Sequence, residues 1–191
     1  MLPKAMTTIR DARVDDAPTI ARVHVATWRT TYPGLIPDSI LVGMSEQRHE
    51  AMWQRSIAHP GGDAVVVADH PEDGVVGFAS CGPLRGLALP FAGEVYTLYV
   101  AQDHQGAGLG RRLLARSFGL LLERGYPSAI VWVLATNPSR FFYRALGGEH
   151  AADRTEALWG VLMDETAFGW RDLRQALSSN RFAVVPPTQD F

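Results

Sequence analysis

Residues 94–114 constrain the fold of this chain more than any other stretch, and they read EVYTLYVAQDHQGAGLGRRLL. An apolar run rich in β-branched and aromatic residues meets a glycine-rich turn, and leucines at helical spacing follow at once. This order predicts a strand over about 94–100, a loop, and a helix over about 109–124. Backbone N–H groups of a glycine-rich loop at a helix N-terminus form a site for a phosphate-bearing ligand.

Helix and strand signals follow one another along the rest of the chain without an internal repeat or an interdomain linker. Acidic residues with Pro18 are typical of a helix start, and two prolines with a glycine over 32–37 end that helix. The further elements expected are a strand at 9–13, a helix from 45 to near 59, a hairpin at 64–68 and 75–81, a strand at 129–134, a helix from 137 to 147, and weaker strands at 149–152 or 157–159 and at 167–170.

This order predicts an α+β fold with a mixed central sheet of about six to seven strands flanked by helices. We expect the domain to span residues 7–173. The remaining tail, 174–191, contains the strand-like run FAVV at 182–185. That run suggests either an added strand or a contact with a partner chain, which would make a homodimer.

Composition excludes several classes of protein. Among 191 residues the net charge is −2, and no basic run is present, so binding to nucleic acid or to an anionic membrane is not expected. One cysteine, Cys81, rules out an internal disulfide framework and suits a reducing compartment. No apolar run reaches the roughly 18 residues of a membrane span, and the first residues do not resemble a signal peptide. We therefore expect a cytoplasmic protein.

The glycine-rich segment 105–112 fits neither of two common nucleotide-binding patterns. A Rossmann fingerprint needs a third glycine where Arg111 stands, and a Walker A loop needs Gly-Lys-Ser/Thr, which the chain lacks. A turn that only lets a helix pack close to a strand stays open as the alternative to a phosphate site. Arg111 and Arg112 would add positive potential at the helix N-terminus, with a solvated helix surface as their alternative.

The pattern Gln105-x-x-Gly108-x-Gly110 resembles the Gln/Arg-x-x-Gly-x-Gly/Ala signature of the GNAT superfamily, the N-acetyltransferases that use acetyl-coenzyme A. Asn137 and Tyr143 stand at the later positions that this family expects, and the segments 25–37 and 167–173 are similar to its bacterial branch. The resemblance covers about 8–173. It implies the GNAT fold and transfer of acetyl from acetyl-CoA to a primary amine, by direct attack in a ternary complex. A CoA-binding sensor or regulatory module without turnover is the alternative.

The resemblance also implies which residues hold the cofactor. The end of the central strand would contact it through main-chain groups, the loop would wrap its phosphates, and an asparagine would bind its pantetheine arm. These cofactor-binding residues are Leu98, Tyr99, Val100, Gln105, Gly106, Ala107, Gly108, Leu109, Gly110, Arg111 and Asn137.

Acetyl transfer to an amine needs a base and an acid. A free alkyl amine has a pKa of roughly 10 and must lose a proton before it attacks. By resemblance Glu94 is the general base, directly or through water, and Tyr143 donates a proton to the departing thiolate. The alternatives are an arginine-paired Glu94 at an exposed strand end, and an aromatic core position for Tyr143.

For the acceptor, a small-molecule or peptide amine, the candidate contacts are Trp28, Tyr32 and Tyr96, whose rings could hold a cation. Core packing is the alternative for all of them. The six histidines show no ligand spacing, and the single cysteine is far from them in sequence. We therefore expect no metal site.

Overall fold

The computed structural model describes residues 6–158 and 160–183. Its centre is a seven-stranded sheet with the order β1-β2-β3-β4-β5-β7-β6. The strands β4 and β5 pair in parallel, and the other neighbours pair antiparallel. The strands are β1 (Thr8–Asp11), β2 (Ala64–His70), β3 (Gly74–Pro83), β4 (Gly93–Val100), β5 (Ala129–Leu134), β6 (Glu149–Leu158) and β7 (Val161–Trp170). The predicted α+β fold with a mixed sheet is confirmed.

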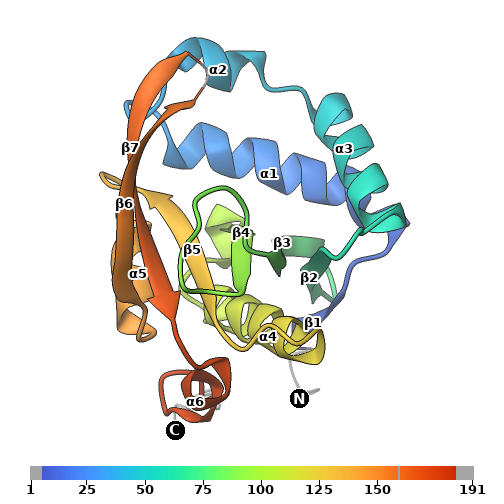
Figure 1. Ribbon diagram of the computed structural model, residues 1–191. Coiled ribbons are helices and arrows are strands. Elements are labelled where there is room, and N and C mark those ends of the chain that lie inside the picture. Colours follow the sequence, from blue (N-terminus) through green and yellow to red (C-terminus); the bar gives the residue numbers. More distant parts are fainter. Residues whose placement is uncertain (1–5, 159, 184–191) are drawn as a thin grey trace, which may run out of the picture.

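Helices cover both faces of this sheet (Figure 1). The helices α1 and α3 lie together over one face, and α4 lies over the other. None of the helices in the described ranges is both long and apolar enough to cross a membrane. The helices are α1 (Ala17–Thr31), α2 (Asp38–Gly43), α3 (Glu46–Ala58), α4 (Leu109–Glu123), α5 (Ser139–Ala145) and α6 (Leu173–Ser178), with short 3₁₀ turns η1 (Val14–Asp16) and η2 (Gln102–His104).

The strand β2 shows how the sequence builds a sheet that is buried on both faces. Its residues are apolar almost without interruption, and successive side chains of a strand point to opposite faces. Val66 packs into the core under α4, whereas its neighbours Val65 and Val67 pack into the core under α1 and α3. A continuous apolar run, and not an alternating one, is therefore what this position in the sheet requires.

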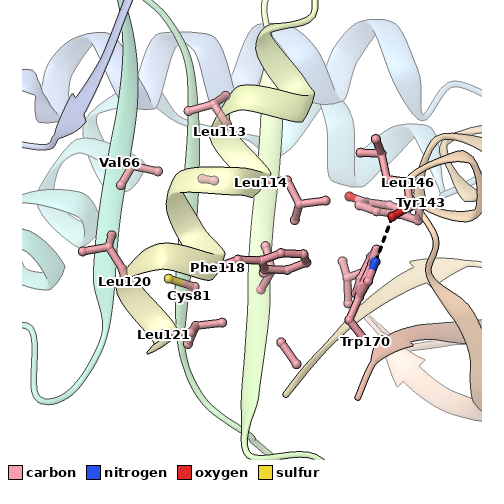
Figure 2. Packing of buried hydrophobic residues seen from close by; sticks show 14 of the residues in the cluster. Val66, Cys81, Leu113, Leu114, Phe118, Leu120, Leu121, Tyr143, Leu146 and Trp170 are labelled. Atoms are coloured by element: carbon pink, nitrogen blue, oxygen red, sulfur yellow. Dashed lines mark hydrogen bonds between the residues drawn. The ribbon is translucent and has the colours of Figure 1, made fainter. Parts of the chain in front are cut away.

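The helix α4 anchors the larger core (Figure 2). Leu113, Leu114, Phe118 and Leu121 are fully buried, and their spacing of about one and two turns places them on one face. Phe118 packs edge to face against Trp170, with ring centroids 5.0 Å apart. This packing holds the N-terminus of α4 beside the end of β4, where the glycine-rich loop lies.

The final strand pair is longer than the sequence predicts. We expected short strands at 149–152 or 157–159 and at 167–170, but β6 and β7 each have ten residues. The outer half of this hairpin is held by polar cross-strand pairs, with Arg154 Nε donating to Glu165 at 2.7 Å and Thr155 Oγ1 donating to Asp164 at 2.6 Å. Charged residues are poor strand formers by themselves, so only the pairing reveals these strands.

The tail is partly helical. Residues 173–178 form α6, and Phe182 is buried in the core under α4, where its ring lies 5.6 Å from that of Phe118. Up to residue 183 the tail forms no strand. The rest of the predicted strand at 182–185 lies outside the described residues, and the boundary at 173 stays a prediction.

Candidate active site

The parallel strands β4 and β5 separate after three residue pairs. They pair only over Gly93–Val95 and Ala129–Val131. Directly after this, the register of β4 with β3 shifts, so that Cys81 pairs with Val95 and Ser80 with Thr97. Tyr96 is thus an extra residue, and such a β-bulge bends its strand. The bend explains why the edge of β4 that faces β5 pairs with no described strand from Tyr96 onward, although the other edge still pairs with β3.

A cavity of about 700 Å³ lies at this separation, and the loop before α4 and the start of α5 help to line it. This volume lies in the range of small-molecule and cofactor sites. The lining includes most of the site residues predicted from the sequence: Tyr32, Tyr96, Leu98, Tyr99, Val100, Gln105, Gly106, Gly108, Leu109, Gly110, Arg111, Asn137 and Tyr143. Glu94, Ala107 and Trp28 are not part of it.

The glycine-rich loop needs glycine for its backbone conformation. Gly106 and Gly108 have φ values of +77° and +74°, a region that other residues enter only with strain. Gly108 is also the N-cap of α4, so the free N–H groups of the first helical turn face the loop. Gly110 has a different reason, because a Cβ there would lie 3.3 Å from Phe142 Cζ. Close packing of α4 against Phe142 therefore explains the glycine at position 110. Gly106 and Gly108 are the glycines that give the loop its backbone conformation.

Some side chains around the loop are hydrogen-bonded to the protein backbone, and another is placed to bind a ligand. Gln105 Nε2 donates to the carbonyl oxygen of Val100 at 3.0 Å and so ties the loop to the end of β4. Arg112 Nη2 donates to the carbonyl oxygen of Thr7 at 2.7 Å. In the described part of the chain, the buried Nε of Arg111 has no hydrogen-bond partner, although Arg111 lines the cavity. A buried guanidinium donor without a partner beside free helical N–H groups fits an anionic ligand such as a pyrophosphate.

Hydrogen-bonded aromatic side chains form one wall of the cavity. The hydroxyl of Tyr99 interacts with Trp28 and with Tyr32, and Tyr32 also interacts with the side chain of Asn137. Because an indole N–H can only donate, the Tyr99 hydroxyl accepts from Trp28 and is free to donate its own hydrogen bond to Tyr32. Asn137 is held in turn, since its Oδ1 accepts from the N–H of Ser139 at 2.9 Å. Trp28 thus lies behind Tyr32, with ring centroids 4.9 Å apart, rather than in the cavity lining.

Tyr143 reaches the cavity from α5 and is otherwise enclosed by aromatic rings. It is 6% exposed, and its ring lies 5.1 Å from Phe142, 6.5 Å from Phe168 and 6.4 Å from Trp170. Burial raises the pKa of the Tyr143 hydroxyl above its ordinary value of 10.0. The phenol is therefore protonated near neutral pH and able to donate. Tyr143 is therefore both a residue of the aromatic core and a residue of the cavity lining.

Glu94 lies just before the point where β4 and β5 separate, and here β4 still pairs with both β3 and β5. Since Val95 packs into the core under α4, the side chain of Glu94 points to the opposite face. It is 8% exposed, and its Oε2 accepts from the N–H of Arg85 at 2.9 Å. Burial raises its pKa above the ordinary 4.5, while the Arg85 N–H and the charge of Arg154 oppose this. The exposed strand end considered as an alternative is therefore wrong.

Tyr96 contributes its ring to the cavity but not a free hydroxyl. Its hydroxyl donates to the carbonyl oxygen of Pro83 at 2.6 Å and contacts Asp63 Oδ1 at 3.2 Å. The guanidinium of Arg85 stacks 3.6 Å from the centre of the Tyr96 ring and also pairs with Asp63. One face of the Tyr96 ring is therefore already occupied by a cation of the protein itself, the guanidinium of Arg85.

Sequence reasoning missed several of the residues that line the cavity. Buried polar atoms without a hydrogen-bond partner among the described residues include Thr27 Oγ1 and Trp132 Nε1, and both residues line the cavity. Trp132 could have been suspected, because a tryptophan in a buried strand needs a partner for its N–H. Thr27 lies on the buried face of α1, and its sequence context does not distinguish it from an ordinary core residue. The other lining residues missed are Thr31, Thr97, Val131, Val133, His104, Pro138, Ser139 and Phe142.

Comparison with known proteins agrees with this architecture. Residues 26–147 match the acetyltransferase (GNAT) family. The uncharacterised N-acetyltransferase YuaI of Bacillus subtilis is 39% identical over 169 residues, which cover 88% of this chain and 95% of that protein.

Solved structures share the fold at lower sequence identity. The protein yncA from Salmonella typhimurium, solved with its cofactor acetyl-CoA, superposes with a TM-score of 0.65 at 22% identity, over 88% of this chain and 95% of that one. The paia N-acetyltransferase from Thermoplasma acidophilum, in complex with coenzyme A, gives 0.64 at 16% identity, over 85% and 98%. From the family match and the similarity to YuaI, the chain belongs to the GNAT family of acetyl-CoA-dependent N-acetyltransferases.

Proposed function

We propose that this enzyme transfers acetyl from acetyl-CoA to a primary amine by direct attack in a ternary complex. One observation carries the proposal: a single cavity between β4 and β5 is lined both by the glycine-rich loop and by Tyr143. A phosphate-binding end and a proton donor therefore share one continuous space. No covalent enzyme intermediate is needed, since Cys81 is buried and lies outside the cavity lining.

The donor half of the cavity suits a long ligand with a diphosphate. The loop N–H groups and Arg111 bind the phosphates, and Asn137 orients the arm that follows. Among the described residues, the edge of β4 that faces β5 has no strand partner from Tyr96 onward, so its main-chain groups are available to the arm and to the thioester carbonyl. Bound acetyl-CoA supplies the activated acetyl group, and the protein supplies position and proton transfer.

Protonation states support separate roles for Tyr143 and Glu94. The raised pKa of Tyr143 keeps a proton available for the departing thiolate. The raised pKa of Glu94 brings this carboxylate closer to the range of a useful base. Because Glu94 is not part of the cavity lining, it acts on the amine through water.

The acceptor amine enters beside Tyr32 and Trp132. Tyr32 from α1 and Trp132 from β5 both line the cavity, and Thr27 adds a buried hydroxyl. Neutral polar atoms on aromatic walls suit an uncharged amine that is attached to a small molecule or a peptide. A cation–π contact with the acceptor is less favourable at both Tyr96 and Trp132, because Arg85 lies over the first ring at 3.6 Å and Arg154 over the second at 4.1 Å.

Release of free thiol from acetyl-CoA, measured with a panel of amines, tests the proposal. Tyr143→Phe should lower turnover by about 10²-fold with little change in cofactor affinity, because only the proton donor is lost. Tyr126→Phe is the matched control, since Tyr126 is not part of the cavity lining. Binding of acetyl-CoA without thiol release from any amine would favour a sensor, and an unchanged rate for Tyr143→Phe would remove this residue from the mechanism.

A further inference from the structure

Two histidines and an aspartate meet at the end of the sheet beside the glycine-rich loop. His70 ends β2, Asp73 lies in the turn before β3, and His104 ends η2, just before the loop. Asp73 Oδ2 lies 3.0 Å from His70 Nδ1 and 3.3 Å from His104 Nε2. All three ligand atoms lie within 4.8 Å of one another, and the two imidazole rings are 5.0 Å apart.

The ring nitrogens of His70 and His104 and a carboxylate oxygen of Asp73 converge on one place. The Nδ1 of His70 is an acceptor for the N–H groups of Asp73 at 3.2 Å and Glu72 at 3.4 Å, and a metal ion on this nitrogen would replace these long contacts. The carboxylate of Asp73 is also an acceptor, and it approaches the same nitrogen at 3.0 Å. Acceptor atoms that converge in this way are stable only around a proton or a metal ion.

The spacing and the ligand types match a small transition-metal ion. Zn²⁺ binds histidine nitrogen and carboxylate oxygen at about 2.0–2.2 Å, so tetrahedral ligand atoms lie roughly 3.3 Å apart. The contacts of Asp73 Oδ2 to the two histidines, 3.0 Å and 3.3 Å, are close to this value. Two imidazoles favour Zn²⁺ and its neighbours over Mg²⁺ or Ca²⁺, which prefer oxygen ligands.

We propose that His70, Asp73 and His104 bind a divalent transition-metal ion of the Zn²⁺ class. The ion would link the β2–β3 turn to the segment that leads into the glycine-rich loop. A water molecule would be its fourth ligand. His104 also lines the cavity, so the proposed metal site adjoins the phosphate-binding end of the cavity. Our expectation that the chain has no metal site rested on linear spacing, whereas Gly77 pairs with Val100 and thereby brings the two turns together.

Calorimetric titration of the untagged protein with ZnCl₂ tests the proposal, with MgCl₂ as the comparison. Wild type should bind one Zn²⁺ and should show no comparable binding of Mg²⁺. His70→Gln and His104→Gln should each weaken Zn²⁺ binding by about 100-fold or more, since the loss of an outer-shell partner alone costs 10–100-fold. His150→Gln is the control, because His150 forms an exposed pair with Asp153 at 2.9 Å.

Binding of Co²⁺ gives an independent readout of geometry. A tetrahedral site with nitrogen ligands produces visible absorption, which should appear in wild type and in His150→Gln and vanish in His104→Gln. Circular dichroism checks that each variant is folded. The proposal is overturned if wild type binds no Zn²⁺, which would leave a proton-mediated pair, or if His150→Gln weakens binding as much as the other variants.

Discussion

At the residue scale, burial keeps both Glu94 and Tyr143 closer to their neutral forms, with opposite consequences. For Tyr143 the neutral form is the active one, because a protonated phenol can donate. For Glu94 the neutral form is the inactive one, because a base must be ionised. On our proposal, acetyl transfer should therefore fall when the pH drops below the raised pKa of Glu94. Tyr143 should sustain transfer well above the ordinary pKa of a phenol.

Replacement of Glu94 by glutamine should separate stability from activity. The folded protein holds the Glu94 proton more tightly than the unfolded chain, whose pKa is near 4.5. The stability gained from this proton is present below that value and is lost as the pH rises through the raised folded pKa. Near neutral pH, Glu94→Gln should thus match or exceed the wild-type free energy of unfolding, while turnover falls by about 10²-fold or more.

Urea denaturation and thiol release on the same samples measure both quantities. Glu50→Gln is the control for the loss of one negative charge, because the Glu50 carboxylate on α3 forms only an exposed hydrogen bond with Gln54. A Glu94→Gln variant with full turnover would exclude Glu94 as the base.

His24 makes the stability of the protein depend on pH in the acidic range. It is buried behind Tyr99, with ring centroids 5.3 Å apart, and its Nδ1 accepts from Trp53 Nε1 at 3.3 Å. Burial, together with the charge of His49, lowers the pKa of His24 from 6.5 to about 3. The stability associated with neutral His24 is therefore present above pH 6.5 and is lost as the pH falls toward about 3.

His24→Gln should flatten this dependence. In wild type, His24 alone should contribute a loss of up to about 1.4 kcal/mol per pH unit within that range. Urea midpoints measured across the range for both proteins provide the check, with the exposed His59→Gln as the control. Parallel curves for wild type and His24→Gln would show that other groups dominate the acid sensitivity.

At the scale of elements, the two ends of α4 carry glycines with similar backbones and different surroundings. Gly108 at the N-terminus and Gly125 after the C-terminus have φ values of +74° and +84°. Gly108 lines the cavity, whereas a Cβ on Gly125 would meet nothing within 4 Å. This pair therefore allows backbone strain to be separated from ligand binding.

Gly108→Glu should abolish binding of CoA, because it places bulk and negative charge against the proposed phosphate site. Gly125→Glu should keep wild-type affinity, although each substitution should cost roughly 1–2 kcal/mol of stability through left-handed strain. Isothermal calorimetry with CoA measures the affinity, and thermal unfolding measures the strain. Unchanged affinity in Gly108→Glu would contradict the assignment of this loop.

At the scale of the whole molecule, the tail belongs to the packing of the core. Phe182 is 7% exposed and contacts the ring of Phe118, which is fully buried under α4. We expect Phe182→Ala to lower the free energy of unfolding by about 3 kcal/mol, from lost burial and the cavity left behind. Phe141→Ala should change it by less than about 0.5 kcal/mol, because Phe141 is 56% exposed.

Chemical denaturation of both variants provides this measurement. Equal stabilities would mean that the tail is only loosely attached. The homodimer suggested by the strand-like run at 182–185 stays a prediction, and light scattering of the full chain can test it. The expected cytoplasmic location likewise stays a prediction.

The sequence by itself determined the elements whose signals are local. The glycine-rich turn, the leucine face of α4 and the apolar runs of β2 and β5 result from short-range chemistry, and the structure forms them close to their predicted limits. The family resemblance rested on Gln105, Gly108 and Gly110 for the same reason, since neighbouring residues define a loop.

Only the tertiary structure decided what depends on residues far apart in the chain. The bulge at Tyr96 and the separation of β4 from β5 arise from pairing with β3, and they create the cavity. The outer parts of β6 and β7 are strands because their charged residues pair across the hairpin. His70 and His104 meet for a similar reason. Long-range pairing sets these features, and no local pattern of amino acids encodes them.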